Sequence, residues 1–295
     1  MPNQSASWRA LLATYISVMM LSANGLFSQS ISFNALDITF HRSWIAFLIL
    51  TALVWYKEGG IRLKDTGDYG KALLLGVLLC IHWVTFFQAM QVAGVATGMV
   101  AIFTYPVITA LLEPWFSKTR IDTTDIVSTA LVFLGIFLLI PGFDLNESGF
   151  QGVLWGLLSA LTFSLRNLIQ RYHFAHYSAM KSLNYQVLVS AIILAAFFSS
   201  PFPLEFIPFS LNDTWLLIIL GIMFTAAPHA LFAYALNNIK AKSVSLIACS
   251  QPVFGTLLAY WLLGEIPENM VIVGGGIILL AAIWETVHIS ARTKT

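Results

Sequence analysis

Ten runs of apolar residues follow one another along the chain, each close to the roughly 20 residues that a helix needs to cross a bilayer. We place them at 9–28, 38–56, 72–91, 95–116, 124–141, 151–171, 182–199, 214–236, 243–263 and 270–288. In lipid only helices and closed barrels satisfy the backbone, and barrel strands are about 10 residues long and alternate in polarity. The sequence therefore predicts an all-α membrane protein with ten transmembrane helices. The first run is long for a signal peptide, and we keep it in the mature chain.

Charged residues are scarce, which supports this class of protein. They make up 10% of the 295 residues, against roughly 25% in a soluble domain. This composition excludes a soluble enzyme, a nucleic-acid binder and a disordered chain. Cys80 and Cys249 both lie in apolar runs, so no disulfide framework is predicted. We also predict no metal and no cofactor.

The positions of Lys and Arg set the orientation. With a cytoplasmic N-terminus, 13 of the 15 cations lie in inner segments and the outer loops hold none. The inner cations are Arg9, Lys57, Arg62, Lys64, Lys71, Lys118, Arg120, Arg171, Lys181, Lys240, Lys242, Arg292 and Lys294. Because cytoplasmic loops are enriched in Lys and Arg, we predict that both termini are cytoplasmic. Short basic inner loops without long soluble insertions favour a bacterial inner membrane.

The chain contains an internal repeat. A shift of 146 residues lays 82–116 over 228–262 with seven identities, Phe86/Phe232, Ala89/Ala235, Pro106/Pro252, Val107/Val253, Leu111/Leu257, Leu112/Leu258 and Trp115/Trp261. With five helices in each half, the second half must enter the membrane inverted, as in many secondary transporters. We assign residues 1–141 to the first half and 151–288 to the second. Residues 142–150 are then an outer linker, and 289–295 a cytoplasmic tail.

Several stretches resemble the EamA type of the drug/metabolite transporter superfamily. They are His41–Ala46, Phe87–Met90 through Tyr105-Pro106-Val107, and Tyr234–Asn237 through Ser250–Val253, ending in Leu262-Leu263-Gly264-Glu265. The resemblance covers essentially the whole chain as two EamA-like halves. It implies a permease whose central cavity is lined mainly by helices 1, 3, 4, 6, 8 and 9. The first half departs from the family, because its fourth helix ends in Glu113-Pro114-Trp115-Phe116-Ser117-Lys118 rather than Gly-Glu.

Two prolines stand near the middle of the predicted fourth and ninth helices. Pro106 and Pro252 are repeat mates, and each removes a backbone hydrogen bond and kinks its helix. The kinks serve either packing alone or a hinge at a water-filled cavity. Pro228 adds a third kink that has no mate.

Polar and aromatic side chains lie at similar depth and are candidates for the substrate cavity. Such groups face either other helices as interhelical hydrogen-bonding groups or a solute. The candidates are Asn24, His82, Trp83, Gln88, Tyr105, Arg166, His229, Ser250 and Gln251. The two histidines are either hydrogen-bonded core residues or proton carriers, and Arg166 either reaches the inner interface or lines the cavity.

Arg42 and Glu113 are candidates for charge coupling. Arg42 lies about one turn inside the outer face, where it either pairs with Asp37, caps a helix or binds solute. Glu113 lies near the inner end of its helix and either pairs with Lys118, Arg120 or another inner cation, or carries protons. The intramembrane excess of charge is positive, and a buried charge needs a counter-charge. The first helix has no Asp or Glu that could neutralise a cationic drug.

These features predict a secondary transporter, not an enzyme, that moves a small carboxylate-bearing metabolite such as an amino acid. The predicted mechanism is alternating access, and family analogy favours export. The other partners are the bilayer and a coupling ion such as a proton, and the protein is a monomer or a homodimer. The alternatives are a channel or assembly factor and, more remotely, a membrane-embedded enzyme. The sequence has neither a His-Glu-x-x-His nor a Gly-x-Ser-x-Gly motif for the last of these.

Overall fold

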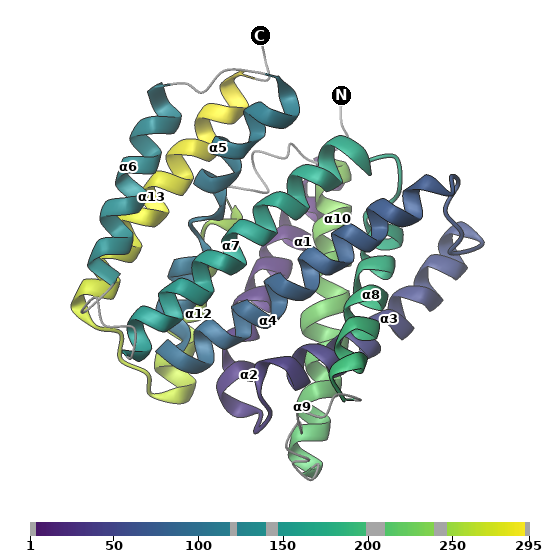
Figure 1. Cartoon of the computed structure of the whole chain (residues 1–295), viewed down its shortest axis with the longest axis horizontal. Coiled ribbons are helices and arrows are strands. Elements are labelled where there is room, and N and C mark those ends of the chain that lie inside the picture. Colours follow the sequence, from purple (N-terminus) through teal and green to yellow (C-terminus); the bar gives the residue numbers. More distant parts are fainter. Residues whose placement is uncertain (1–3, 119–122, 140–146, 199–209, 239–246, 293–295) are drawn as a thin grey trace.

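The computed structural model describes residues 4–118, 123–139, 147–198, 210–238 and 247–292. Within these ranges the chain is helical and has no β-strand (Figure 1). The helices of the first half are α1 (Gln4–Ser22), α2 (Asn24–Ser30), α3 (Ala35–Glu58), α4 (Gly67–Ile102), α5 (Tyr105–Ser117) and α6 (Thr123–Leu139). Those of the second half are α7 (Ser148–His173), α8 (Ala179–Phe198), α9 (Leu211–Gly221), the π-helix η1 (Ile222–Ala226), α10 (Ala227–Asn238), α12 (Gln251–Leu263) and α13 (Asn269–Arg292).

The helices follow the predicted order of apolar runs. Six helical stretches are long and apolar enough to cross a membrane, and three shorter apolar helices lie at 126–138, 251–263 and 269–284. The first predicted run is divided between α1 and α2, and the eighth among α9, η1 and α10. The expectation of an all-α membrane protein is therefore confirmed.

The third predicted span and the first part of the fourth lie in one helical element, α4, which is broken at Gly94 and reverses direction there. Gly94 has φ 83° and ψ 163°, a conformation that is essentially restricted to glycine. Four residues beyond the break, Gly98 packs so closely on Met90 that a Cβ would lie 2.9 Å from the Met90 backbone nitrogen. The two spans thus form a hairpin that has no separate loop.

The two repeat-mate prolines do not kink continuous helices, and that expectation is corrected. α4 ends at Ile102, and α5 begins at Tyr105 with Pro106 in its first turn. α12 likewise begins at Gln251 with Pro252 in its first turn. In the first turn, proline's missing N–H has no intrahelical partner to lose, so the chain breaks before each proline.

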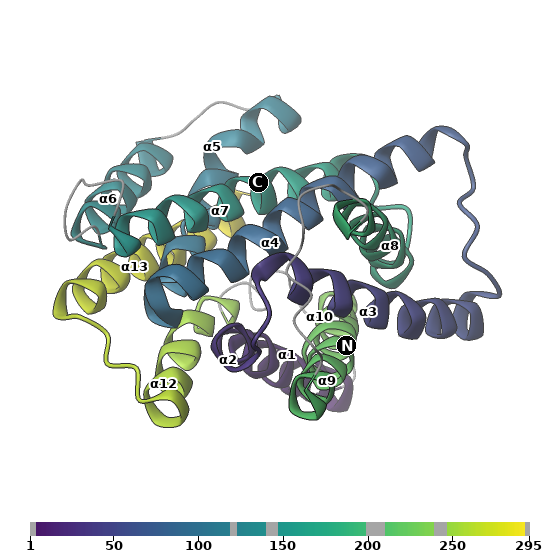
Figure 2. The same cartoon turned by 60° about the horizontal axis from the view of Figure 1, so that its bottom comes forward.

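Helix pairs from the two halves pack on one another. α4 lies along α7, α3 packs on α8 and α6 packs on α13, as Figures 1 and 2 both show. Small residues allow the α4–α7 approach, because a Cβ on Gly152 would lie 2.1 Å from the Cβ of Ala93. The start of α1 and the end of α13 lie at the same side of the molecule in Figure 1. An even number of membrane crossings produces this arrangement.

The largest apolar core joins α2, α4 and α9. Phe27, Met90, Met99, Phe103 and Leu220 are among its buried members. It therefore spans both halves and both arms of the α4 hairpin.

Candidate functional site

Arg42, on α3, is buried against aromatic side chains of α4. The residue has 1% of its surface exposed. The guanidinium carbon lies 4.1 Å from the ring centroid of Trp83 and 5.0 Å from that of Phe87, one turn further along α4. On α10, the ring of His229 stacks on Trp83 with 6.3 Å between centroids. Two aromatic faces thus hold the cation by an attraction worth about 2 kcal/mol in a desolvated setting.

The polar edge of this guanidinium is unsatisfied. Nε and Nη1 of Arg42 are buried and have no hydrogen-bond partner. Asp37, the partner considered from the sequence, does not fill this role, because its own Oδ1 is also buried without a hydrogen bond. A buried charge without a hydrogen-bonded counter-charge is costly by several kcal/mol. The site is therefore suited to an anionic group.

Arg166 is also intramembrane, but its donors are engaged by neutral groups. Its Nε donates to Gln186 Oε1 at 2.8 Å, and its Nη1 donates to Asn167 Oδ1 at 2.9 Å. Gln186 in turn donates to Ser182 Oγ at 2.8 Å. Among the described residues, no carboxylate forms an ion pair with either Arg166 or Arg42. The network orients Arg166 without neutralising its charge.

His82 is held by hydrogen bonds and ring contacts. Its Nδ1 lies 2.9 Å from Ser159 Oγ, while the Ser159 hydroxyl donates to the His82 carbonyl at 2.8 Å. Because that hydroxyl has one hydrogen, Nδ1 must be the donor toward Ser159. The imidazole also stacks on Phe163 at 4.5 Å. Both His82 and His229 lie close enough to Arg42 and Arg166 to interact with their charges, so four basic groups share one region.

The other predicted cavity residues are placed around this region or have local partners. Tyr105 contacts Phe163 edge to face at 4.9 Å. Ser250 donates to the carbonyl of Ile247 at 2.6 Å. Asn24 is 4% exposed, and its Oδ1 is buried without a partner. The remaining two, Gln88 and Gln251, are half-buried.

Glu113 has partners at the inner end of its helix. Tyr172 donates a 2.8 Å hydrogen bond to Oε1, and Nη1 of Arg171 lies 3.2 Å from the same oxygen. Arg171 is thus an ion-pair partner, whereas the sequence named only Lys118 and Arg120 specifically. This carboxylate has a structural use independent of proton transfer.

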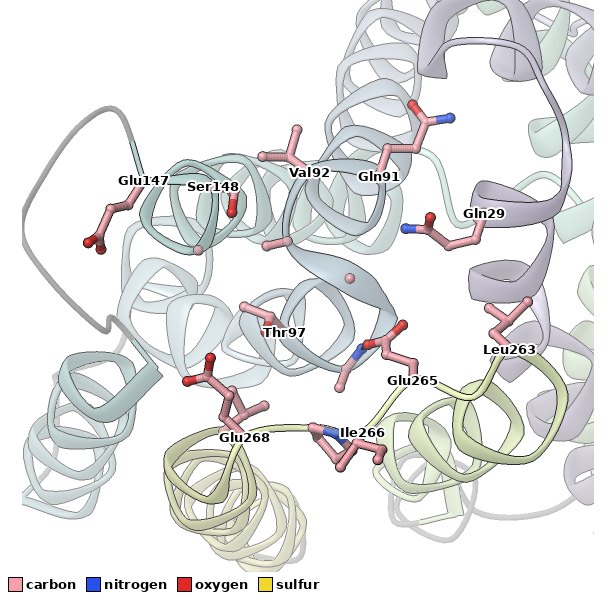
Figure 3. A pocket seen from close by; sticks show the side chains of 16 residues that line it. Gln29, Gln91, Val92, Thr97, Glu147, Ser148, Leu263, Glu265, Ile266 and Glu268 are labelled. Atoms are coloured by element: carbon pink, nitrogen blue, oxygen red, sulfur yellow. Dashed lines mark hydrogen bonds between the residues drawn. The ribbon is translucent and has the colours of Figure 1, made fainter.

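An open cavity of about 860 Å³ lies at the opposite end from these pairs. Figure 3 shows Glu147, Glu265 and Glu268 around it, together with Gln29, Gln91 and Thr97. None of the nine predicted cavity residues lines it. The buried basic region and this open cavity are therefore separate features of the described structure.

Glu265 is a residue whose role the sequence did not reveal. Its carboxylate accepts the N–H groups of Val95 and Ala96, both at 2.9 Å, and so caps the second arm of the α4 hairpin. Helix N-termini favour such an anion. The Gly264-Glu265 ending was visible as a family feature, but nothing in the spacing indicated that its carboxylate reaches a hairpin 170 residues away.

Long apolar helices, a hairpin of two spans and helices that begin at two repeat-mate prolines define a polytopic membrane protein built from two matching halves. Comparison with known proteins agrees: the profile of the EamA-like transporter family matches residues 8–140 and again 150–286. The chain belongs to this family.

Relatives and a solved structure are similar over most of the chain. An uncharacterised transporter of Archaeoglobus fulgidus is 22% identical over 90% of this chain and 92% of its own length. An S-adenosylmethionine uptake transporter of Rickettsia felis is 23% identical over 91% of this chain and 89% of its own length. One crystal structure has a TM-score of 0.67 and 17% identity, covering 94% of this chain and 97% of its own, which shows a shared fold.

Proposed function

We propose that this membrane transporter is a secondary transporter that moves a small carboxylate-bearing metabolite, such as an amino acid, by alternating access. We assign it to the bacterial inner membrane with both termini cytoplasmic, and export as its direction. The two halves that we propose as units are 1–141 and 151–288. In Figure 1 the end of α3 and the starts of α4 and α8, which carry inner cations, lie toward the end where α1 begins, which supports this orientation.

The observation that carries the choice of solute is the unsatisfied guanidinium of Arg42. A carboxylate would accept a hydrogen bond from the unsatisfied Nε or Nη1 of Arg42, and hydrogen bonds between charged groups are the strong ones. The aromatic faces of Trp83 and Phe87 already fix the plane of the guanidinium. The solute would thus supply the counter-charge that the described protein groups do not.

Two further observations support transport by this site. Arg166 adds positive charge to the same region, where its hydrogen-bond partners are neutral, so an anionic group is favoured over a lipophilic cation. Broken helices at Gly94 and before Pro106 and Pro252 resemble the discontinuous helices at which transporters bind solutes. The Rickettsia relative is named for S-adenosylmethionine uptake, and that solute also has an amino-acid carboxylate, beside its sulfonium cation.

The test is counterflow in proteoliposomes after a thermal-shift screen of amino acids, their carboxamides and S-adenosylmethionine. We expect stabilisation and saturable counterflow by a carboxylate, and none by its carboxamide. Arg42→Gln removes the charge and should reduce counterflow at least tenfold, because hydrogen bonds between charged groups contribute about 1.5–3 kcal/mol. Arg42→Lys should retain an intermediate rate.

The matched control is Arg62→Gln, which removes the same charge from an exposed inner loop position. It should transport at the wild-type rate. Equal counterflow by the Arg42→Gln and Arg62→Gln proteins, or equal use of acid and carboxamide, would contradict the carboxylate site. A flux that does not saturate and shows no counterflow would instead favour a channel.

A further inference from the structure

Two buried aspartates lie at corresponding places in the two halves and at opposite ends of the bundle. Asp68 is in the first turn of α4, which begins the third span of the first half. Asp213 is in the first turn of α9, which begins the third span of the second half. Each residue is 3% exposed. Because the halves are inverted in the proposed topology, one aspartate faces the inner side and the other the outer side.

Asp68 joins its half to the loop between α7 and α8. Its Oδ2 accepts the hydroxyl of Tyr177 at 2.9 Å and lies 3.0 Å from Nε2 of His176. The Tyr177 hydroxyl also accepts the N–H of Lys64 at 2.7 Å, and burial raises the pKa of this phenol. The Tyr177 hydroxyl, on an inner loop of the second half, thus contacts both Asp68 and Lys64 of the first half. We name Asp68, His176 and Tyr177 the inner clasp.

Asp213 makes the corresponding connection at the other end. Its Oδ1 accepts the N–H of Ser32 at 3.1 Å, in the loop between α2 and α3. Ser210, the N-cap of α9, donates to Oδ2 at 2.6 Å and accepts the Asp213 N–H at 2.9 Å. The serine orients the carboxylate, and the carboxylate holds the first half. We name Asp213 and Ser32 the outer clasp.

We propose that the inner and outer clasps are the two gates of the transport cycle. Each joins the loop between the first two spans of one half to the start of the third span of the other half. Movement of one half relative to the other must therefore break a clasp at the end that opens. Both are closed in this structure, so opening to either side includes the loss of the carboxylate contacts of one clasp.

Neither clasp includes Arg42 or its aromatic partners, and both aspartates lie in the first turn of their helices. Tyr177 also packs in an apolar cluster with Leu63, Leu75 and Phe174. This cluster would survive the loss of the hydroxyl alone, so Tyr177→Phe weakens the clasp while it keeps the packing.

The inference rests on the proposed alternating access but not on the identity of the solute, and thiol labelling tests it without any solute. Cys80 and Cys249 are replaced, and a single cysteine is introduced one turn inside each clasp, at Ser182 or at Ser28. Both serines are 2% exposed. Labelling rates with a polar maleimide are measured on the purified full chain in detergent.

Asp68→Asn should increase labelling at position 182 about tenfold and leave labelling at 28 unchanged or slower. Asp213→Asn should have the opposite effect, faster at 28 and not at 182. Tyr177→Phe should act in the same direction as Asp68→Asn, and it becomes the deciding variant if Asp68→Asn does not elute as a single species. The matched controls are Asp65→Asn, an exposed acid on the same inner loop, and Glu268→Gln, an exposed acid at the outer end.

Three results would overturn the gates. The first is equal labelling at position 182 in the Asp68→Asn, Tyr177→Phe and Asp65→Asn proteins. The second is equal labelling at position 28 in the Asp213→Asn and Glu268→Gln proteins. The third is faster labelling at both positions in one variant, which would indicate local unfolding. Reciprocal labelling without counterflow of any carboxylate would support the gates and contradict the proposed solute. Counterflow of a carboxylate without reciprocal labelling would contradict the gates and support the proposed solute.

Discussion

The two halves end their proline-initiated helices in the same backbone shape but with different chemistry. α5 is followed by Lys118 with φ 58°, and α12 is followed by Gly264 with φ 69°, both left-handed. These residues are mates in the 146-residue repeat. After Gly264 comes Glu265, whose carboxylate caps the α4 hairpin. After Lys118 the sequence has Thr119, which is not an acid.

This difference separates the backbone features that shape the fold of both halves from a side-chain contact that stabilises one end of the molecule. The break before proline and the left-handed ending occur in both halves, so they do not depend on the Gly-Glu pair. In the described residues, the carboxylate cap of the second half ties the α12–α13 connection to the hairpin at Gly94. The corresponding position of the first half is Thr119, which has no charge to form such a cap.

The largest expected effect comes from Gly94→Ala. The native φ and ψ are unfavourable for alanine by about 3 kcal/mol, and the new Cβ would lie 2.8 Å from Glu265 Oε1. We expect a lower melting temperature and a lower yield of monodisperse protein. Gly60→Ala is the control, since no heavy atom lies within 4 Å of its Cβ position. Equal melting temperatures for both variants would show that the hairpin does not need glycine.

Glu265→Gln should have the next largest effect. The amide keeps one acceptor oxygen but places an NH₂ group against a backbone N–H, so one of the two charge-assisted bonds is lost at a cost of about 2 kcal/mol. The melting temperature of the variant, measured beside that of Glu268→Gln, checks this. If both variants melt alike, the carboxylate cap contributes nothing beyond its exposed neighbour.

Lys118→Gly should have the smallest effect and the opposite sign. A left-handed conformation costs a residue with a side chain about 1 kcal/mol relative to glycine. The variant should therefore melt slightly above the wild type. Gly264→Ala should melt slightly below it, because alanine disfavours the left-handed conformation. The effect is small because nothing lies within 4 Å of that Cβ position. A decrease for Lys118→Gly would mean that the lysine side chain contributes more than the strain.

The sequence predicts the fold well because hydrophobic length and loop charge are local signals. Short stretches of sequence are enough to show the order of the apolar runs and the correspondence of Pro106 and Pro252 in the repeat. They also show the resemblance to the EamA-like family. The helix break itself was placed wrongly, since a proline inside an apolar run looks the same whether it kinks a helix or begins one.

The site is less accessible to sequence reasoning because its contacts join distant segments. Asp37, five residues away, was one of the alternatives that the sequence offered for Arg42, but the structure places Trp83 and Phe87 against the guanidinium. Asp68, Asp213 and Glu265 stand near helix ends, where acids are ordinary, and their cross-half contacts follow only from how the halves pack. The position of a charge was visible, whereas its partner was not.

The hairpin at Gly94 has a consequence for how the protein enters the membrane. The segment between its arms, Val92–Val95, has no charged side chain, and the second arm starts directly after the glycine. Both arms can therefore insert together as one apolar unit, with no polar connection to translocate. A charged residue introduced at the tip of the hairpin would make membrane insertion during synthesis less favourable, even if the folded protein tolerated it.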